Sequence, residues 1–435
     1  MINKFLKSSL FKSTLIYTVS DAINKAVPFF VLPILSYYLT PKDYGIVTNF
    51  NILVGILNIL AALSIDGVIS VHYYKISKED LAKFLFNGIS LVILSTAILA
   101  VFCSLFRDRI YDGLQVPIEY VYLAIFMTFA NTMSTVNLTI WRLEEKPFKF
   151  GGYKIALTIV NTSVSLLLVI AVGLGWKGSV DGTLIATILF GFLSLFLLWR
   201  RGYFVPQFDK KIRLAILSFG LPLIPHSLSM WVRSAIDRIY ISNFYSVADT
   251  GLYATGFQFG ILVSFVMMAF NNAFVPYLYK KLSVTDEHQL KQNENGLKKV
   301  TYIGVGLLVI GSAIFYLISI FVLNRFYSVS YRGAKPFILW AIVAQFFQGL
   351  YLFAVNYIFF VKKTKSLAII TFSCSLVQVL LSYFLIKDLG PIGGAYSTVI
   401  VSGLNFVCVA WYSNKVYPMA WFKFKTVIKN NEEQQ

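Results

Sequence analysis

The stretch VTYIGVGLLVIGSAIFYLISIFVL, residues 300–323, is apolar and contains no charged side chain. A bilayer core of roughly 30 Å requires about 20 mostly apolar helical residues, because lipid offers the backbone no hydrogen-bond partner. This stretch is therefore expected to cross a membrane, and eleven further runs of similar character accompany it. The twelve expected spans are residues 13–38, 45–70, 84–106, 117–140, 155–173, 182–199, 214–241, 251–276, 300–323, 336–361, 366–386 and 392–413.

The composition agrees with a membrane protein. Of the 435 residues, 57% are hydrophobic and only 13% are charged, whereas roughly a quarter of the residues of a soluble domain are charged. Aromatic residues make up 17% of the chain, as expected for helices that meet lipid tails and interfacial belts. We therefore predict an all-α integral membrane protein.

The basic residues predict its orientation. With a cytoplasmic N-terminus, the inner segments hold 27 Lys and Arg and the outer connections hold 8, while Lys25, Arg233 and Arg238 lie within spans. This asymmetry places both termini in the cytoplasm. The net charge of +18 is then mostly a positive-inside signature, and we expect no nucleic-acid partner.

The connections leave little room for a separate catalytic domain. The longest, at about residues 277–299, is charged and expected to be cytoplasmic, and the outer connections are short. The sequence contains no phosphate-binding loop, dinucleotide fingerprint, zinc-protease motif or nucleophile elbow. A transporter without a cofactor is therefore predicted, driven either by a proton or sodium gradient or by downhill movement of its substrate.

Two parts of the sequence resemble each other in the same order. YYLTPKDYGIV at 37–47 matches FYSVADTGLYA at 244–254, aligning Asp43 with Asp249 and Gly45 with Gly251 without a gap. A later pair lies at 178–187 and 390–399. The alternative explanation is that Gly and Asp are simply common between helices. We favour a duplication into two six-helix lobes, residues 1–206 and 207–435, which enter the membrane in the same direction and enclose a substrate between them.

Six ionisable residues lie within the expected spans, where each costs roughly 2.5–3.5 kcal/mol or more unless it faces protein or water. They are Asp21, Lys25, Asp66, Arg233, Asp237 and Arg238. Four-residue spacing puts Asp21 and Lys25 on one helix face, and Arg233 and Asp237 on another. Both pairs lie on the first helix of a predicted lobe.

We interpret Lys25, Arg233 and Arg238 as positive charges that face an anionic substrate, with Asp21 and Asp237 orienting them. The alternative is that these residues form ion pairs that hold helices together. Arg238, near the outer end of its span, could also extend to the interface or pair with Asp237. Asp66 is a candidate for binding a proton or sodium ion in coupling.

Several motifs resemble the family of polysaccharide and O-antigen flippases, within the multidrug/oligosaccharidyl-lipid/polysaccharide exporter superfamily. They are LPILSYYLTPKDYGIV at 32–47, WRLEEKPFKFGGY at 141–153, SFGLPLIPHSLSMWVRSAIDRIYIS at 218–242 and the following TGLYATGFQFG. The resemblance implies the fold of the multidrug and toxic compound extrusion transporters, with a central cationic cavity. By position, it points to Lys25 and Arg233 as ligands of a diphosphate.

The resemblance also implies a substrate and a setting. The substrate would be an undecaprenyl-diphosphate-linked oligosaccharide, moved from the cytoplasmic to the outer leaflet of the bacterial inner membrane. The product would serve O-antigen, lipopolysaccharide, capsule or related surface polysaccharide biosynthesis, with a polysaccharide polymerase and glycosyltransferases as partners. It does not specify the sugar.

Three other functions compete with this one. A multidrug exporter of the same superfamily would take cationic drugs, and the three acids and three bases within the spans do not decide against it. A lipid II flippase usually has two more helices than are found here. A membrane polymerase or glycosyltransferase usually carries a large outer loop, which this chain lacks.

Overall fold

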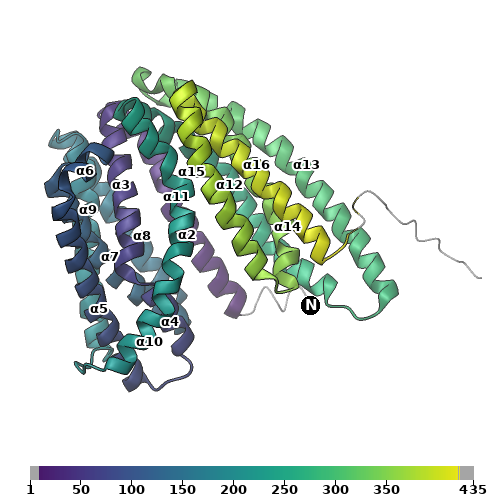
Figure 1. The fold of residues 1–435 in the computed structure, drawn as a ribbon, viewed down its shortest axis with the longest axis horizontal. Helices are drawn as coiled ribbons and strands as arrows, with labels where there is room; N and C mark the ends of the chain where they lie inside the picture. Colours follow the sequence, from purple (N-terminus) through teal and green to yellow (C-terminus); the bar gives the residue numbers. More distant parts are fainter. Residues whose placement is uncertain (1–8, 420, 422–435) are drawn as a thin grey trace, which may run out of the picture. The chain divides into compact units, whose positions relative to one another are not determined.

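The computed structural model describes residues 9–419 and residue 421 (Figure 1). In this part of the chain the elements are α-helical, with short 3₁₀ and π segments. The first half contains α2 (Ser9–Leu35), α3 (Pro41–Ala62), α4 (Ile65–His72), α5 (Lys78–Leu105), α6 (Arg107–Leu114), α7 (Ile118–Leu143), α8 (Pro147–Leu166), η1 (Leu167–Ala171) and α9 (Trp176–Arg200). The second contains α10 (Lys210–Gly220), η2 (Leu221–Leu223), α11 (Ile224–Phe244), α12 (Val247–Leu282), α13 (Glu287–Phe326), η3 (Val329–Ala334), α14 (Lys335–Phe360), α15 (Thr364–Leu389) and α16 (Pro391–Val416).

The predicted membrane fold is confirmed. Helical elements cover most of each of the twelve expected spans. Within the described residues, eleven helical segments are long and apolar enough to cross a membrane, and α2 is helical without being one of them. On α13, Leu307, Leu317 and Phe321 are each more than 60% exposed, which suits a lipid-facing surface.

Several helices extend beyond their expected limits, among them α8, α12 and α13. The connection expected at residues 277–299 is mostly helical, because α12 continues to Leu282 and α13 begins at Glu287. Similarly, α8 begins at Pro147 and not at residue 155. Hydropathy marks only the apolar part of a helix, whereas Lys, Glu and Gln are good helix formers and proline is favoured at a first helical position.

The second expected span is broken in its last third. α3 ends at Ala62, and the next two residues, Leu63 and Ser64, have positive φ angles of 49° and 52°. Residues other than glycine rarely adopt this left-handed conformation, so it interrupts the helix. α4 then begins at Ile65, which places Asp66 in its first turn.

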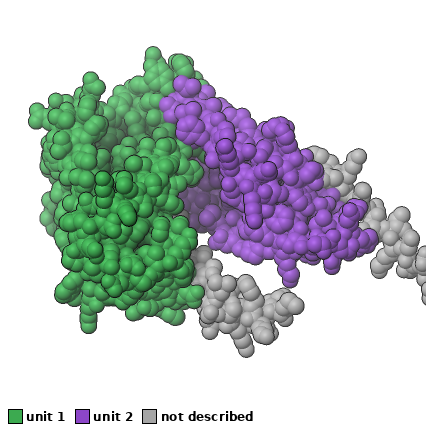
Figure 2. Space-filling view, turned by 60° about the horizontal axis from the view of Figure 1, so that its bottom comes forward, with its two compact units in different colours: residues 1–255, 323–334, 382–394 green, residues 256–322, 335–381, 395–435 purple. Residues whose placement is uncertain are grey.

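The described chain forms two compact units (Figure 2). Unit 1 comprises residues 1–255, 323–334 and 382–394, and unit 2 comprises residues 256–322, 335–381 and 395–435. The helices α12, α13, α15 and α16 each contribute residues to both units. The predicted lobe boundary between residues 206 and 207 concerns the duplication, and it stays a prediction.

The repeated motifs meet inside unit 1. A Cβ on Gly45 would lie 1.9 Å from the carbonyl oxygen of Val247, and a Cβ on Gly251 would lie 2.0 Å from that of Pro41. In the alignment of Gly45 with Gly251, Pro41 corresponds to Val247, so the contact is reciprocal. Reciprocity of this kind is what a two-fold axis produces, and the duplication itself stays a prediction.

Both repeated helices also begin in the same way. Thr40 and Asp43 form a capping box at the start of α3, in which each side chain bonds the backbone of the other. At the start of α12 the hydroxyl of Ser246 accepts from the backbone N–H of Asp249 and donates to its carboxylate. Such caps satisfy N–H groups that the first turn leaves unpaired.

Candidate functional site

Asp21 of α2 forms an ion pair with Lys154 of α8. The two side chains are 48% and 28% exposed, respectively, so neither is sealed inside the protein. The ammonium of Lys154 also lies over the ring of Phe150, 5.1 Å from its centroid. Asp21 therefore has an ion-pair partner, Lys154, that sequence reasoning had not singled out, and its predicted role in orienting Lys25 stays a prediction.

Lys154 was missed because the fifth span was expected to begin at residue 155, which counted this lysine with the cytoplasmic connection. The structure places it in the second turn of a helix that starts at Pro147. The signal that could have found it is the run of good helix formers after this proline.

The polar contacts continue along α8. One turn after Lys154, the hydroxyl of Thr158 donates to the side-chain carbonyl of Asn24 in α2. Farther along, the side-chain oxygen of Asn161 accepts from Ser165 at 3.2 Å and from Thr183 of α9 at 3.0 Å. Hydrogen bonds of this kind join helices within membranes, so α2, α8 and α9 are linked by a line of polar side chains.

Lys25 lies in α2, four residues after Asp21, as expected from the sequence. Its side chain lies outside what the structure describes. The prediction that it binds a diphosphate therefore stands on sequence position alone.

The second predicted group lies on α11. Asp237 is only 4% exposed, and its carboxylate accepts from the hydroxyls of Tyr253, at 2.9 Å, and Ser382. A buried carboxylate requires such donors, because leaving it without them costs several kcal/mol. Sequence reasoning did not identify either hydroxyl, since they belong to α12 and α15.

The two arginines of α11 are both half-buried. Arg233 lies one turn before Asp237 on this helix. The guanidinium of Arg238 donates to the backbone carbonyl of Ser234 in its own helix. Arg238 therefore directs at least one of its donors toward its own backbone.

Asp66 occupies a different kind of position. It is half-buried and lies in the first turn of α4, directly after the break at Leu63 and Ser64. The free N–H groups of a first turn favour negative charge, so the backbone stabilises the carboxylate here. Its proposed part in ion coupling stays a prediction.

A charged network lies at the end of α7, within the WRLEEKPF sequence. Glu144 accepts from Arg201 at 2.6 Å and from the hydroxyl of Tyr203 at 2.8 Å, and it pairs with Lys146 at 2.9 Å. Burial alone would raise the pKa of Glu144, but these partners outweigh it and hold the pKa below its usual value. Burial and the neighbouring Glu144 raise the pKa of Tyr203.

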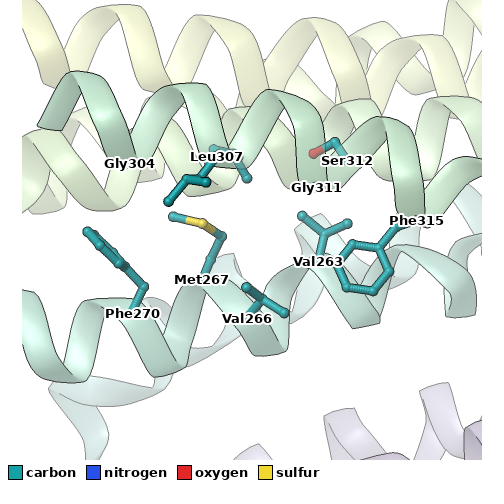
Figure 3. Close-up of a pocket in the computed structure, with 10 residues that line it drawn as sticks. Val263, Val266, Met267, Phe270, Gly304, Leu307, Gly311, Ser312 and Phe315 are labelled. Atoms are coloured by element: carbon teal, nitrogen blue, oxygen red, sulfur yellow. The ribbon is translucent and has the colours of Figure 1, made fainter. Parts of the chain in front are cut away.

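Unit 2 contains an apolar pocket between α12 and α13 (Figure 3). The side chains of Met267 and Phe270 from α12 and Leu307 from α13 line it, and Gly304 and Gly311 leave room along α13. The hydroxyl of Ser312 is the only polar side-chain group among these lining residues. The pocket therefore suits hydrocarbon and not a phosphate.

Comparison with known proteins identifies relatives for most of the chain. The model of the polysaccharide biosynthesis protein family matches residues 10–282. Two proteins of Haemophilus influenzae are similar in sequence. "Lsg locus putative protein 1" is 27% identical, with 86% of this chain and 89% of the relative covered. An "uncharacterized membrane protein" is 28% identical, with 90% and 92% covered.

Solved structures share the fold. A multidrug resistance MATE family transporter of the MOP superfamily, in an inward-facing conformation, superposes with a TM-score of 0.72 at 15% identity, with 90% of this chain and 94% of that chain covered. The lipid II flippase MurJ, in an inward closed conformation, has a TM-score of 0.66 at 17% identity, with 95% and 93% covered. At these identities the likeness concerns the fold alone, and it confirms the predicted relation to the multidrug and toxic compound extrusion fold.

Proposed function

Because the chain belongs to the polysaccharide biosynthesis protein family, we propose that it is a flippase for an undecaprenyl-diphosphate-linked oligosaccharide. It would move this lipid from the cytoplasmic to the outer leaflet of a bacterial inner membrane by alternating access. The single observation that carries the proposal is the family match over residues 10–282. The product would supply O-antigen, lipopolysaccharide, capsule or a related surface polymer.

The intramembrane charges support this substrate class. A diphosphate is a compact anion, and lysine and arginine are the side chains that bind phosphate oxygens. We propose Lys25 of α2 and Arg233 of α11 as its ligands, with Arg238 as a further cation. Asp21, Asp66 and Asp237 would hold or balance these charges, or bind a proton or sodium ion that drives the cycle. A polymerase and glycosyltransferases would act as partners on either side of the step.

Transport in liposomes tests the proposal. The purified protein would be reconstituted, and the transbilayer movement of a polyprenyl-diphosphate oligosaccharide followed for wild type, Lys25→Ala and Arg233→Ala at equal insertion. Each variant is expected to slow movement about tenfold or more, since one charge-assisted hydrogen bond contributes at least about 1.4 kcal/mol. Arg107→Ala serves as the control, because Arg107 pairs only with exposed Asp108 in the described structure.

Two other outcomes are informative. If both variants move the lipid as fast as the wild type, the flippase proposal is kept, and Lys25 and Arg233 are assigned to helix packing. If wild type moved no lipid above empty liposomes, with the native glycan and an imposed ion gradient, the flippase proposal would be abandoned. The multidrug exporter would then be tested with cationic drugs in the same vesicles.

A further inference from the structure

A cluster around the ring of Phe150 combines two cations with a phenol. The guanidinium of Arg142 lies 5.6 Å from the ring centroid and the ammonium of Lys154 lies 5.1 Å from it. The ring of Tyr17 packs edge-to-face against Phe150 at 4.9 Å. These four residues, here called the Phe150 cluster, come from α2, α7 and α8 within unit 1.

The cluster lies near one end of its helices. Arg142 is the next-to-last residue of α7, and Lys154 lies seven residues after the start of α8, which is about 10 Å along the helix axis. The polar headgroup layer is about 5–8 Å thick on each side of the hydrocarbon core. The cluster therefore extends from the headgroup layer into the edge of the core, on the side that the Lys and Arg distribution predicts to be cytoplasmic.

Polar groups of the cluster lack partners of their own. The hydroxyl of Tyr17 is buried and has no hydrogen-bond partner in the described structure, although a buried tyrosine hydroxyl usually finds one. Arg142 is exposed. Among the described residues its guanidinium lies against the Phe150 ring and interacts electrostatically with the Tyr17 hydroxyl, without a hydrogen bond or ion pair. This leaves its guanidinium donors open to an acceptor. A phosphate group would satisfy both.

We propose that the Phe150 cluster is the entry site for the diphosphate of the lipid-linked glycan, an inference that rests on the proposed function. The exposed guanidinium of Arg142 receives the anion, and the Tyr17 hydroxyl donates to a phosphate oxygen. The ammonium of Lys154 then exchanges its Asp21 partner for the phosphate.

Asp21 has a definite part in this exchange. Its carboxylate holds the ammonium of Lys154 when no substrate is present, which avoids an unpaired charge in the membrane. The carboxylate of Asp21 also competes with the phosphate for the ammonium of Lys154. The diphosphate is therefore held weakly enough to leave the entry site during transport. The alternative is that Asp21 and Lys154 only link α2 to α8.

Binding measurements separate these two explanations. Affinity for undecaprenyl diphosphate would be measured in nanodiscs, with undecaprenyl monophosphate, undecaprenol and phosphatidylglycerol as comparison lipids. Arg142→Gln and Lys154→Gln are each expected to weaken diphosphate binding about tenfold, and Tyr17→Phe about threefold. Asp21→Asn is expected to strengthen it about threefold or more, because the competing carboxylate is lost. Undecaprenol binding is expected to be unchanged in every variant.

Two control variants guard against folding effects. Lys154→Arg keeps the charge and is expected to retain affinity within about threefold. Lys83→Gln breaks ion pairs with Glu79 and Asp80 within α5 of the same unit and is expected to leave affinity unchanged. Thermal unfolding of each variant would be measured alongside binding.

Four results would overturn the proposal. If Asp21→Asn and Lys154→Gln each lower the unfolding temperature and also weaken diphosphate binding, the ion pair only links α2 to α8. If phosphatidylglycerol competes as well as the diphosphate, the cluster binds anionic headgroups in general. If the cluster variants bind the diphosphate normally while Arg233→Ala stops transport, the entry-site proposal is wrong and the flippase proposal is kept. If the wild-type protein does not bind undecaprenyl diphosphate, both proposals are wrong.

Discussion

At the residue scale, Glu144 allows a test by pH. Its partners Arg201, Lys146 and Tyr203 hold its pKa below the usual value. A lowered pKa means that the stabilisation is fully present above the unfolded value of about 4.3 and is lost as pH falls through the folded value. Glu144→Gln is therefore expected to lower stability by about 1–3 kcal/mol at pH 7.

The measurement is thermal unfolding followed by tryptophan fluorescence between pH 7 and pH 3.5. The difference in unfolding temperature between wild type and Glu144→Gln should narrow as pH falls below about 4. Glu145→Gln is the matched control, because this neighbouring glutamate is exposed. A difference that stayed constant with pH would contradict the electrostatic explanation.

The side chains that contact the intramembrane acids were harder to predict from the sequence than the acids themselves. The sequence marks Asp21 and Asp237 as intramembrane acids, because hydropathy and helix spacing are local properties. Their partners Lys154, Tyr253 and Ser382 belong to helices that are distant in the sequence. Only the packed structure decides which helices are neighbours, so no pattern in one chain could assign these contacts.

At the scale of elements, the crossing of α3 and α12 depends on two glycines. Gly45→Ala and Gly251→Ala would each place a methyl group about 2 Å from a backbone carbonyl oxygen, and backbone cannot move aside as a side chain can. Each substitution is expected to cost about 1–3 kcal/mol. Because both act on one crossing, the double variant is expected to lose less than the sum.

Equilibrium unfolding in mixed detergent micelles would measure these losses. Gly152→Ala is the control, since a Cβ there would meet no atom within 4 Å and alanine favours helix over glycine by up to about 1 kcal/mol. Stability equal to wild type in Gly45→Ala would contradict the close crossing.

At the scale of the whole molecule, the orientation in the membrane can be tested directly. With the native cysteines replaced by serine, Asp112→Cys in α6 is expected to react with an impermeant maleimide on intact cells. Thr285→Cys, between α12 and α13, should react only after permeabilisation. Both side chains are exposed, so access to the reagent depends on the side of the membrane. The reverse pattern would invert the predicted topology.

The helices over the twelve expected spans were predictable because each is encoded by its own composition, and lipid permits no other single-segment structure. The break at Leu63 and Ser64 was not, because neither residue favours a left-handed conformation by itself. The extent of α12 and α13 beyond the apolar runs was also missed, since hydropathy ends where the helix leaves the bilayer. What a sequence pattern predicts is thus the membrane part of the fold.

The reciprocal contact between residues 41–45 and 247–251 has a historical consequence. In a symmetric pair of identical chains, one glycine would have served both sides of the crossing, since each chain presents the same surface to the other. On the predicted duplication, a gene encoding six helices, inserted in one orientation, would have formed this crossing as a homodimer before any fusion joined the copies. The present chain would have inherited its α3 and α12 crossing from a subunit interface of an ancestor about half its length.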